Sequence, residues 1–449
     1  MTRSPLLFTI LKLAWPMIIA RSTQAIVGLS DALMSAPLGE AGLAAVTTGS
    51  VNTFSILTLP CGTAFILQSF SAQFAGRNDK QTNTRYAWYG LIFSAQAGLI
   101  VIALLPALPW FLHLFAYQTS VRLQIADYMY YRFIGAFAVI GLEAIGNWYA
   151  GLGKTRLHMN AGLIGMICNV FLNFLLIEGH WGAPALGAKG AGIASSIASI
   201  IAFLALLVFF LFDQRKYNLA ALRTMKGSEF LRVLWFGLPH GTNLFLEFAA
   251  FTVFISVVVA QLGTTVLAAA MVVFNINTAS YMPAFGVSSA GAIIAGQHIG
   301  SKQSSRVWPT LKTTILIAIA WEVTVGFFYL CIPEQLMLWF AFDQDSNEMI
   351  RIGASMLVVS ATWQVFDAVS MSYGETLRAA GDTFWCMLAR ILLSWLFFVP
   401  LAYFSAIIFN GGYLAAMVSL LCCLVALAAI LAWRFHSGAW RQISLTGNT

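Results

Sequence analysis

The chain has 449 residues, of which 59% are hydrophobic and only 9% are charged. Soluble domains usually carry about 25% charged residues, so this composition excludes a soluble fold. The net charge of +7 at pH 7 would suit an acidic partner, but its meaning depends on where the basic residues lie.

Twelve apolar stretches are each long enough to cross a membrane as a helix. The chain allows about 37 residues for each helix of ~20 apolar residues with its loop. Breaks rich in glycine, proline or charge separate the predicted helices, which lie at residues 8–35, 42–75, 86–112, 124–150, 157–178, 190–213, 229–260, 266–298, 308–332, 349–375, 384–408 and 412–435. The first is expected to stay in the mature chain, because its apolar run is longer than that of a cleaved signal peptide. The sequence therefore predicts an all-α membrane protein with twelve transmembrane helices.

The basic residues gather at alternate ends of these helices. Of the 24 Lys and Arg residues, Arg21 and Arg132 fall within predicted helices, and only Arg122, Lys189 and Arg351 are predicted on the side that is poor in basic residues. Cytoplasmic loops of membrane proteins are rich in Lys and Arg. Both termini are therefore expected in the cytoplasm, in a multi-pass protein of the bacterial inner membrane. The net charge then reflects orientation in the lipid bilayer, and no nucleic-acid partner is expected.

The two halves of the chain resemble each other. Residues of the first half recur in the second in the same order and nearly all at an offset of about 224, as internal repeats do. The pairs are Pro16 with Pro239, Gly39 with Gly263, Gln73 with Gln297, Gly153 with Gly381, and Gly187 with Gly411. Six helices per half predict two lobes, 1–222 and 223–449, related by a pseudo-twofold axis around a central cleft. The two prolines at matching depths are candidate hinges.

Five acidic residues are predicted inside the membrane-spanning helices: Asp31, Glu143, Glu247, Glu322 and Asp367. A charge at the centre of a bilayer costs about 2.5–3.5 kcal/mol on insertion scales, so such side chains should face the interior of the bundle or water. A carboxylate in such a place indicates a functional site. We expect Asp31, Glu247 and Asp367 to bind the coupling ion or proton.

Amide side chains accompany these three acids. Gln24 precedes Asp31 by seven residues and projects from the same helical face. Further amides occur at Asn243, Gln364, Asn169 and Asn173; the first two precede Glu247 and Asp367 by four and three residues, and the last two form an i, i+4 pair. An amide can hold a carboxylate in either protonation state, although hydrogen bonds that only join helices are an equal alternative for any one amide.

Two buried charges fit a structural role better. Glu143 lies eleven residues from Arg132 and close to the same helical face, which favours a structural ion network. Arg21, three residues before Gln24, either neutralises a buried acid or contacts an anionic substrate, and the sequence leaves both readings open.

No pattern of enzyme chemistry is present. The chain has no HExxH, no P-loop, no GxSxG in a plausible setting and no paired metal-binding aspartates, so we expect no catalytic residue, no cofactor and no enzyme activity. Its six cysteines show no CxxC spacing, which predicts neither a zinc site nor a disulfide framework. The one metal considered is a sodium ion at Glu247 and Asp367.

Four segments resemble the multidrug and toxic compound extrusion (MATE) family of antiporters. They are the first helix from Pro16 to Gly39, the Asn169-Val-Phe-Leu-Asn173 segment, the Ala185 to Gly192 loop, and the run from Gln364-Val-Phe-Asp367 to Asp382. The spacing of Pro239 and Glu247 is similar to that of the bacterial branch typified by NorM. The resemblance implies two six-helix lobes and efflux of organic cations, drugs or metabolites in exchange for protons or sodium. By position, Asp31, Asn169 and Asn173 resemble the acid network of the N-lobe, and Glu247 and Asp367 the cation site of the C-lobe.

One departure from the family affects the expected ion. Four residues before its Asp the branch often has a tyrosine, whereas this chain has Trp363. An indole nitrogen only donates a hydrogen bond, so the site loses one oxygen ligand. Sodium needs several oxygens and a proton only one carboxylate, so we expect a proton to be the coupling ion. Asn243, Gln364, Trp363 and Arg21 are the candidate substrate contacts.

The sequence thus predicts a secondary efflux antiporter that exports small organic compounds, expected to be cationic or amphipathic, and acts as a monomer in the bilayer. One alternative is a flippase of a related fold for a lipid-linked oligosaccharide, which would need more basic residues in the cleft than Arg21 and Arg132. Another is an intramembrane lipid-modifying enzyme, which would need clustered catalytic residues in loops.

Overall fold

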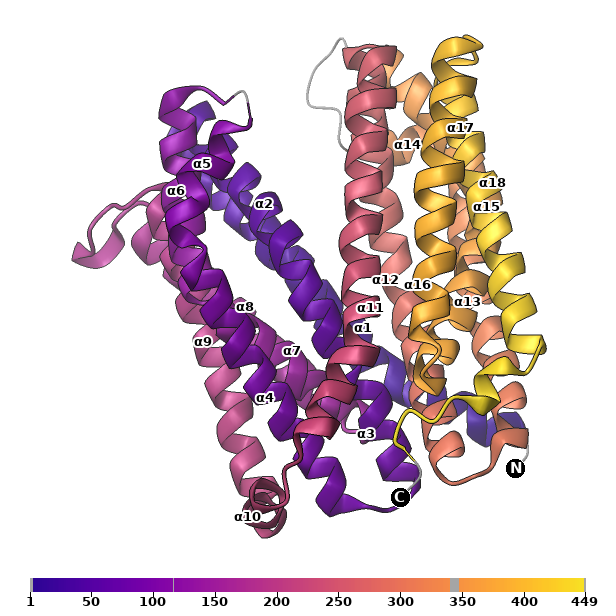
Figure 1. Ribbon diagram of the computed structural model, residues 1–449. Helices are drawn as coiled ribbons and strands as arrows, with labels where there is room; N and C mark the ends of the chain where they lie inside the picture. The colour runs from indigo at the N-terminus through magenta and orange to yellow at the C-terminus, as the bar shows by residue number, and fades with distance from the viewer. Residues whose placement is uncertain (1–2, 116, 340–346, 448–449) are drawn as a thin grey trace. The chain divides into compact units, whose positions relative to one another are not determined.

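The computed structural model describes residues 3–115, 117–339 and 347–447, and these residues form helices and short connections without any strand (Figure 1). The α-helices are α1 (Arg3–Ser35), α2 (Gly39–Phe65), α3 (Leu67–Gly76), α4 (Lys80–Ala103), α5 (Leu108–His113), α6 (Thr119–Ile134), α7 (Ala136–Gly151), α8 (Thr155–Leu176), α9 (Ala188–Asp213), α10 (Arg215–Arg223), α11 (Gly227–Val253), α12 (Thr264–Gly300), α13 (Val307–Cys331), α14 (Pro333–Leu338), α15 (Asn347–Ala380), α16 (Thr383–Leu392), α17 (Val399–Tyr403) and α18 (Gly412–His436). Short 3-10 segments are η1 (Ala36–Leu38), η2 (Leu105–Ala107), η3 (His180–Gly182), η5 (Val259–Leu262), η6 (Ser304–Arg306) and η9 (Ala439–Gln442), and π-helical segments are η4 (Phe254–Val258), η7 (Leu393–Phe398) and η8 (Phe404–Ile408).

The described residues contain the predicted twelve membrane-spanning helices. Ten segments are long and apolar enough to span a membrane, and the bent pair of α6 and α7 makes eleven. One of the ten, Leu6–Gly76, has 71 residues and holds both α1 and α2, so it accounts for two spans. The predicted all-α membrane fold is therefore confirmed.

Glycines end or begin helices at equivalent places in the two halves. Gly39 at the start of α2 and Gly263 before α12 have φ of 77° and 110°, which residues with a side chain rarely adopt. Gly153 and Gly381, which precede α8 and α16, likewise have φ of 78° and 98°. These shared turns give the sequence repeat a physical basis. Gly187, which the sequence repeat pairs with Gly411, has a φ of 58°. In the second half the positive φ belongs to Gly412, the residue after Gly411.

Two compact units make up the chain. Unit 1 consists of Met1–Ile18 and Asn243–Thr449, and unit 2 consists of Ile19–Thr242. Helices α1 and α11 therefore each contribute to both units, and each changes unit two or three residues after its internal proline, Pro16 or Pro239. These units differ from a division after residue 222. Residues 1–18 of the first half belong to unit 1, and residues 223–242 of the second half belong to unit 2.

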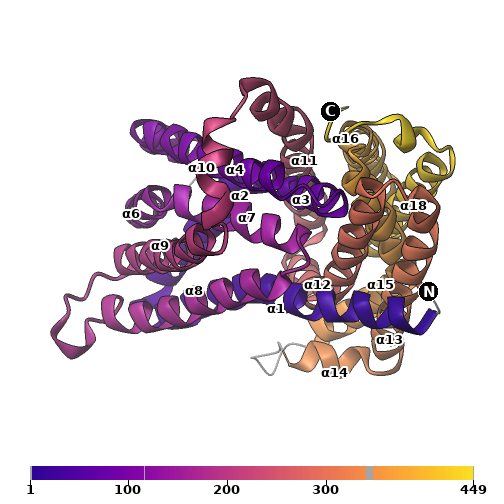
Figure 2. The ribbon, with the colours of Figure 1, turned by 90° about the horizontal axis from the view of Figure 1, so that it is seen from below.

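A single helix lies at the centre of each unit. In unit 1, α15 packs against α12, α13 and α18, and in unit 2, α7 packs against α2, α3, α4, α8 and α9 (Figure 2). Both are the fourth membrane-spanning helix of their half. Within unit 1, the start of α1 and the end of α18 lie at the same end of the bundle (Figure 1).

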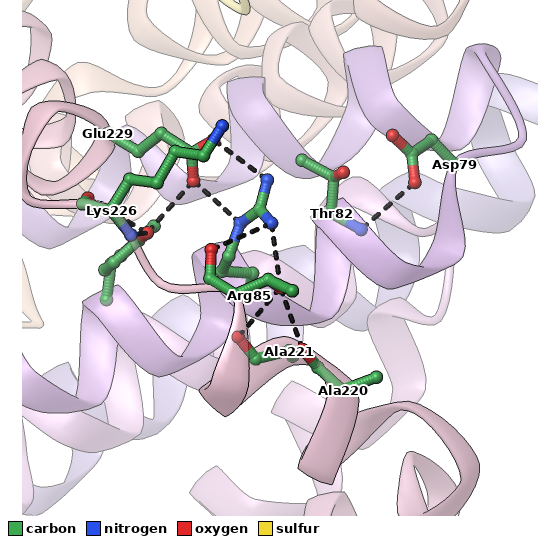
Figure 3. A network of polar contacts seen from close by, with 9 residues as sticks. Asp79, Thr82, Arg85, Ala220, Ala221, Lys226 and Glu229 are labelled. Atoms are coloured by element: carbon green, nitrogen blue, oxygen red, sulfur yellow. Dashed lines mark hydrogen bonds and ion pairs between the residues drawn. The ribbon is translucent and has the colours of Figure 1, made fainter.

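Polar contacts fix the connection between the two halves to α4 of unit 2. The guanidinium of Arg85 donates to the carboxylate of Glu229 at 2.7–2.8 Å and to the hydroxyl and carbonyl oxygens of Thr224 at 3.0 and 3.2 Å (Figure 3). The hydroxyl of Tyr89 lies 2.9 Å from a Glu229 oxygen, and the backbone nitrogen of Lys226 donates to that hydroxyl at 2.7 Å. The start of α11 is thus held by a charged, partly buried network.

Candidate ion and substrate sites

Asp31 is buried in unit 2 among neutral hydrogen-bond donors. Its side chain accepts from Nδ2 of Asn173 at 2.5 Å and from Oγ of Ser195 at 3.1 Å, and the residue is only 2% exposed. Asn169 completes the network, since its Nδ2 donates to Ser195 at 2.9 Å and its Oδ1 accepts from Asn173 at 3.2 Å. The structure thus joins the predicted residues Asp31, Asn169 and Asn173 and adds Ser195.

Three helices bring this network together. Asp31 lies on α1, the two asparagines on α8, and Ser195 on α9. Helix α9 comes close to its neighbours through glycines: a Cβ at Gly192 would lie 2.6 Å from the carbonyl oxygen of Tyr128, and one at Gly190 would overlap the backbone of α8. Such close contact is what small residues permit between membrane helices.

Several polar side-chain atoms of unit 2 are buried without a hydrogen-bond partner in the described part of the chain, and two of them belong to Tyr128 and Asn173. The hydroxyl of Tyr128 and Oδ1 of Asn173 have no hydrogen-bond partner among the described residues. No ion pair to Asp31 is found in this part of the chain either, although the charge of Arg132 acts on its carboxylate from a distance. Asp31 is therefore held in place without a cation in direct contact.

A second buried acid of unit 2, Glu143, has a cation beside it. Nη1 of Arg21 lies 3.3 Å from the Glu143 carboxylate, and Asn147 donates to the same group at 2.9 Å. His158 approaches to 3.9 Å. Of the two readings of Arg21, the structure favours the neutralisation of a buried acid. The expected Glu143 partner, Arg132, instead donates to Ser199 at 3.5 Å.

Gln24 belongs to this second network and not to that of Asp31. Its Nε2 donates to Oε1 of Glu143 at 2.7 Å. The prediction that Gln24 accompanies Asp31 is therefore wrong in its partner, because a shared helical face does not determine which neighbouring helix each side chain meets.

In unit 1, Glu247 of α11 is paired with Arg390 of α16. Nη1 of Arg390 lies 3.3 and 3.5 Å from the two carboxylate oxygens, and Nδ2 of Asn243 donates at 3.4 Å, as the i, i+4 spacing predicts. The side chain of Glu247 is 45% exposed, so this acid is far more accessible than Asp31. Arg390 was not among the predicted site residues, because its position near the start of the predicted helix 384–408 placed it with the basic residues of the cytoplasmic side.

Asp367 is partly buried and lies within electrostatic range of both Glu247 and Arg390. The phenol group of Tyr281 on α12 also lies within electrostatic range of these three side chains. The structure therefore groups the two predicted acids of the second half and adds a cation and a phenol to them.

Two residues expected near Asp367 have other partners. Gln364 donates to Oδ1 of Asn277 at 3.0 Å rather than to the carboxylate. Trp363 is 5% exposed and packs in an apolar core with Val273 and Phe398, which is the position of a core residue rather than of a substrate contact. Both lie on α15, whose buried faces meet several helices at once.

A sodium ion does not fit Glu247 as the structure presents it. Sodium is a hard cation that takes several oxygen ligands, whereas both oxygens of Glu247 face the guanidinium of Arg390. Among the described residues, no three or more His, Cys, Asp or Glu side chains are grouped as metal ligands would be.

Comparisons with known proteins agree on one family. The family model MatE matches residues 16–175 and 227–404, which together are more than half of the chain. The chain is 25% identical over 400 residues to the probable multidrug resistance protein NorM of Photorhabdus laumondii, covering 88% of this chain and 86% of that protein. It is 27% identical over 391 residues to the probable NorM of Chromobacterium violaceum, covering 85% and 82%.

Several solved structures share nearly the same fold. One of them is described as the outward-facing conformation of a multidrug resistance MATE family transporter, and it is similar to this chain with a TM-score of 0.89 and 20% identity over 98% of this chain and 97% of that one. At such low identity the likeness concerns the fold alone.

Proposed function

The chain belongs to the MatE family, and from this we propose that it is a secondary antiporter that exports small organic compounds in exchange for protons. The relatives that cover most of its length are named multidrug resistance proteins, which supports efflux as the activity. Cationic and amphipathic compounds are the proposed substrates, because the accessible acid Glu247 offers them a negative partner.

The observation that carries the proposal is the environment of Asp31. A carboxylate that is only 2% exposed within a membrane-spanning helix is costly to bury, so its presence there indicates a functional site. Its partners are the hydroxyl of Ser195 and the amide of Asn173, and a hydroxyl can donate to the ionised form or accept from the protonated one. Gain or loss of a proton at Asp31 therefore changes its hydrogen bonds, and this can shift helix α1 between two conformational states.

Protons are proposed over sodium because of Arg390. This guanidinium already supplies a positive partner to both oxygens of Glu247. Asp367 lies near both groups, so the cluster carries two acids and one fixed cation. One proton suffices to neutralise it.

Two other activities are not favoured. A flippase for lipid-linked oligosaccharides would need cations free to bind phosphates, whereas Arg21 and Arg390 are paired with acids. A lipid-modifying enzyme does not fit relatives that are named as multidrug resistance proteins.

The proposed setting is the bacterial inner membrane. Both ends of the described chain lie at the same end of unit 1, which is consistent with two cytoplasmic termini (Figure 1). We propose that the protein acts as a monomer, with alternating access provided by its two lobes and with Pro16 and Pro239 as hinges.

Everted vesicles from cells that make the protein test the proposal. With an imposed pH gradient and a pH-sensitive dye, addition of an organic cation such as tetraphenylphosphonium should release protons from the vesicle lumen. Vesicles from cells without the protein are the control. Cation uptake that leaves the pH gradient unchanged would contradict proton exchange.

A further inference from the structure

Among the described residues, Glu322 is the most deeply buried acid of unit 1. It lies in the middle of α13 and is 0% exposed, and neither of its carboxylate oxygens has a hydrogen-bond partner among the described residues. No ion pair to it is found there either. Buried polar groups almost always have partners, so an acid without any needs an explanation.

Polar side chains without charge lie near Glu322 on α12 and α13. Ser280 of α12 accepts a hydrogen bond from Tyr329 at 3.1 Å, and its carbonyl oxygen accepts from Trp321 at 2.9 Å. Tyr329 lies two turns after Glu322 on α13 and is its titratable neighbour on that helix. A further polar contact joins α12 to α15, where Gln364 donates a hydrogen bond to Asn277.

One charged group acts on Glu322 from a neighbouring helix, and it is the carboxylate of Asp367 on α15. Helix α12 contributes Ser280 to these polar side chains, and the nearest basic residue on α13 itself, Lys312, is ten residues away. An ionised Glu322 would therefore have no cation to compensate it, and burying an unpaired charge costs far more than burying an unpaired neutral polar group. A neutral, protonated carboxyl is therefore the form that this site holds while no cation is bound nearby.

We propose that Glu322 is a second proton-binding carboxyl of unit 1, which exchanges its proton with Asp367. This inference rests on the proposed proton exchange and extends it to a residue outside the predicted site. The exposed fraction of the three acids falls from Glu247 at 45%, through the partly buried Asp367, to Glu322 at 0%. Asp367 thus lies between the accessible acid and the enclosed one.

The exchange conserves atoms and charge. The O–H bond of Glu322 breaks and an O–H bond forms on Asp367, so that the negative charge moves from Asp367 to Glu322. The proton then leaves Asp367 for water or for the Glu247 carboxylate. Because two nearby acids repel each other when both are charged, loss of this proton from the pair requires a cation at the cluster. Arrival of a cationic substrate near Glu247 supplies that charge.

Proton release by the purified, full-length protein in detergent tests this role. The protein is kept in weak buffer with a pH-sensitive dye and titrated with tetraphenylphosphonium, and protons released per protein are counted. The variant is Glu322→Gln, which keeps the shape of the side chain but has no acidic proton. Glu334→Gln is the matched control, because Glu334 is an exposed acid at the start of α14.

The expected result is release of about one proton fewer by Glu322→Gln than by the wild type, because an amide carries no acidic proton. Glu334→Gln should match the wild type. Equal release by wild type and Glu322→Gln would overturn the role of Glu322 and leave the proposed antiport standing. Absence of any release by the wild type would overturn the proposed proton exchange itself.

An infrared measurement on the wild type keeps the proposal testable if Glu322→Gln fails to fold. A protonated carboxyl without hydrogen bonds gives a separate carbonyl stretch that shifts in heavy water. This band should disappear when tetraphenylphosphonium binds. A band that persists at saturating tetraphenylphosphonium would overturn the role of Glu322.

Discussion

Two buried acids of unit 2 have opposite kinds of partner. Glu143 faces the guanidinium of Arg21 at 3.3 Å, whereas Asp31 is bonded to the neutral side chains of Asn173 and Ser195. A paired carboxylate is held in its ionised form by the adjacent cation. An acid with neutral partners can take up a proton without leaving a partner cation buried and unpaired. The first arrangement suits structure and the second suits proton exchange.

Replacing Asp31 with asparagine tests this difference. Asp31→Asn removes the charge while keeping a side chain of the same size, so the protein should be present in the membrane at the wild-type level. An amide has no acidic proton to exchange, so proton-driven efflux of a dye should fall by about tenfold or more. Asp127→Asn, an exposed acid on α6, is the control. Wild-type efflux by Asp31→Asn would rule out the role of Asp31.

Replacing Arg21 with alanine tests the structural role of the other acid. Arg21→Ala leaves Glu143 buried without its cation, and breaking a buried pair in this way costs about 3–5 kcal/mol. The melting temperature of the purified protein in detergent should fall well below that of the exposed-site variant Arg215→Ala. The double variant Arg21→Met with Glu143→Gln should recover much of the loss. A stable Arg21→Ala protein with altered substrate preference would instead favour a substrate contact.

Individual partners were the hardest feature to predict from the sequence. Helical spacing correctly joined Asn243 to Glu247 and Asn169 to Asn173, because both pairs lie one turn apart on one helix. It misassigned Gln24, since the choice between Asp31 and Glu143 depends on how three helices pack. Contacts between helices distant in sequence leave no local pattern.

At the scale of elements, close contacts through glycine hold α11 against α2 in unit 2. A Cβ at Gly241 would overlap the carbonyl oxygen of Leu59 and lie 2.9 Å from the backbone nitrogen of Thr63, and one at Gly237 would lie 2.7 Å from the carbonyl oxygen of Thr63. Backbone atoms cannot move aside as a flexible side chain can. The first half of α11 is thus fixed to unit 2.

The variant Gly241→Ala should be clearly less stable than the wild type. The added methyl group forces α11 away from α2, and overpacking of this kind typically costs about 1–3 kcal/mol. Gly28→Ala is the matched control, because a Cβ there meets no atom within 4 Å and alanine is the better helix former. Thermal unfolding of both proteins in the same detergent gives the comparison. Equal melting temperatures would show that α11 can shift without cost.

The membrane-spanning helices were predictable in number and nearly in their bounds. Long apolar runs broken by glycine, proline and charge determine them, and those signals are local. The bend of 48° between α6 and α7 and the π-helical segments η4, η7 and η8 were not predicted. These features depend on packing, as at Gly135, where a Cβ would lie 2.8 Å from the hydroxyl oxygen of Ser196.

At the scale of the whole molecule, the proposed proton coupling is tested through the charges around Glu247. Wild-type efflux should persist in sodium-free buffer with an imposed pH gradient, because the guanidinium of Arg390 occupies both oxygens of Glu247. Arg390→Gln releases those oxygens and should make efflux respond to added sodium. Dye efflux from loaded vesicles measures both effects, with the exposed-site variant Arg351→Gln as control. A strict sodium requirement in the wild type would contradict proton coupling.

The exchange of segments at α1 and α11 has a consequence for how the protein is made. A chain cut after residue 222 yields two pieces, and neither contains a whole unit: residues 1–18 of the first piece belong with unit 1, and residues 227–242 of the second belong with unit 2. During synthesis, unit 2 therefore stays incomplete until α11 has left the ribosome. Two pieces produced in the same cell should assemble into a working transporter, whereas either piece alone should be degraded, because each supplies a helical segment that the other lacks.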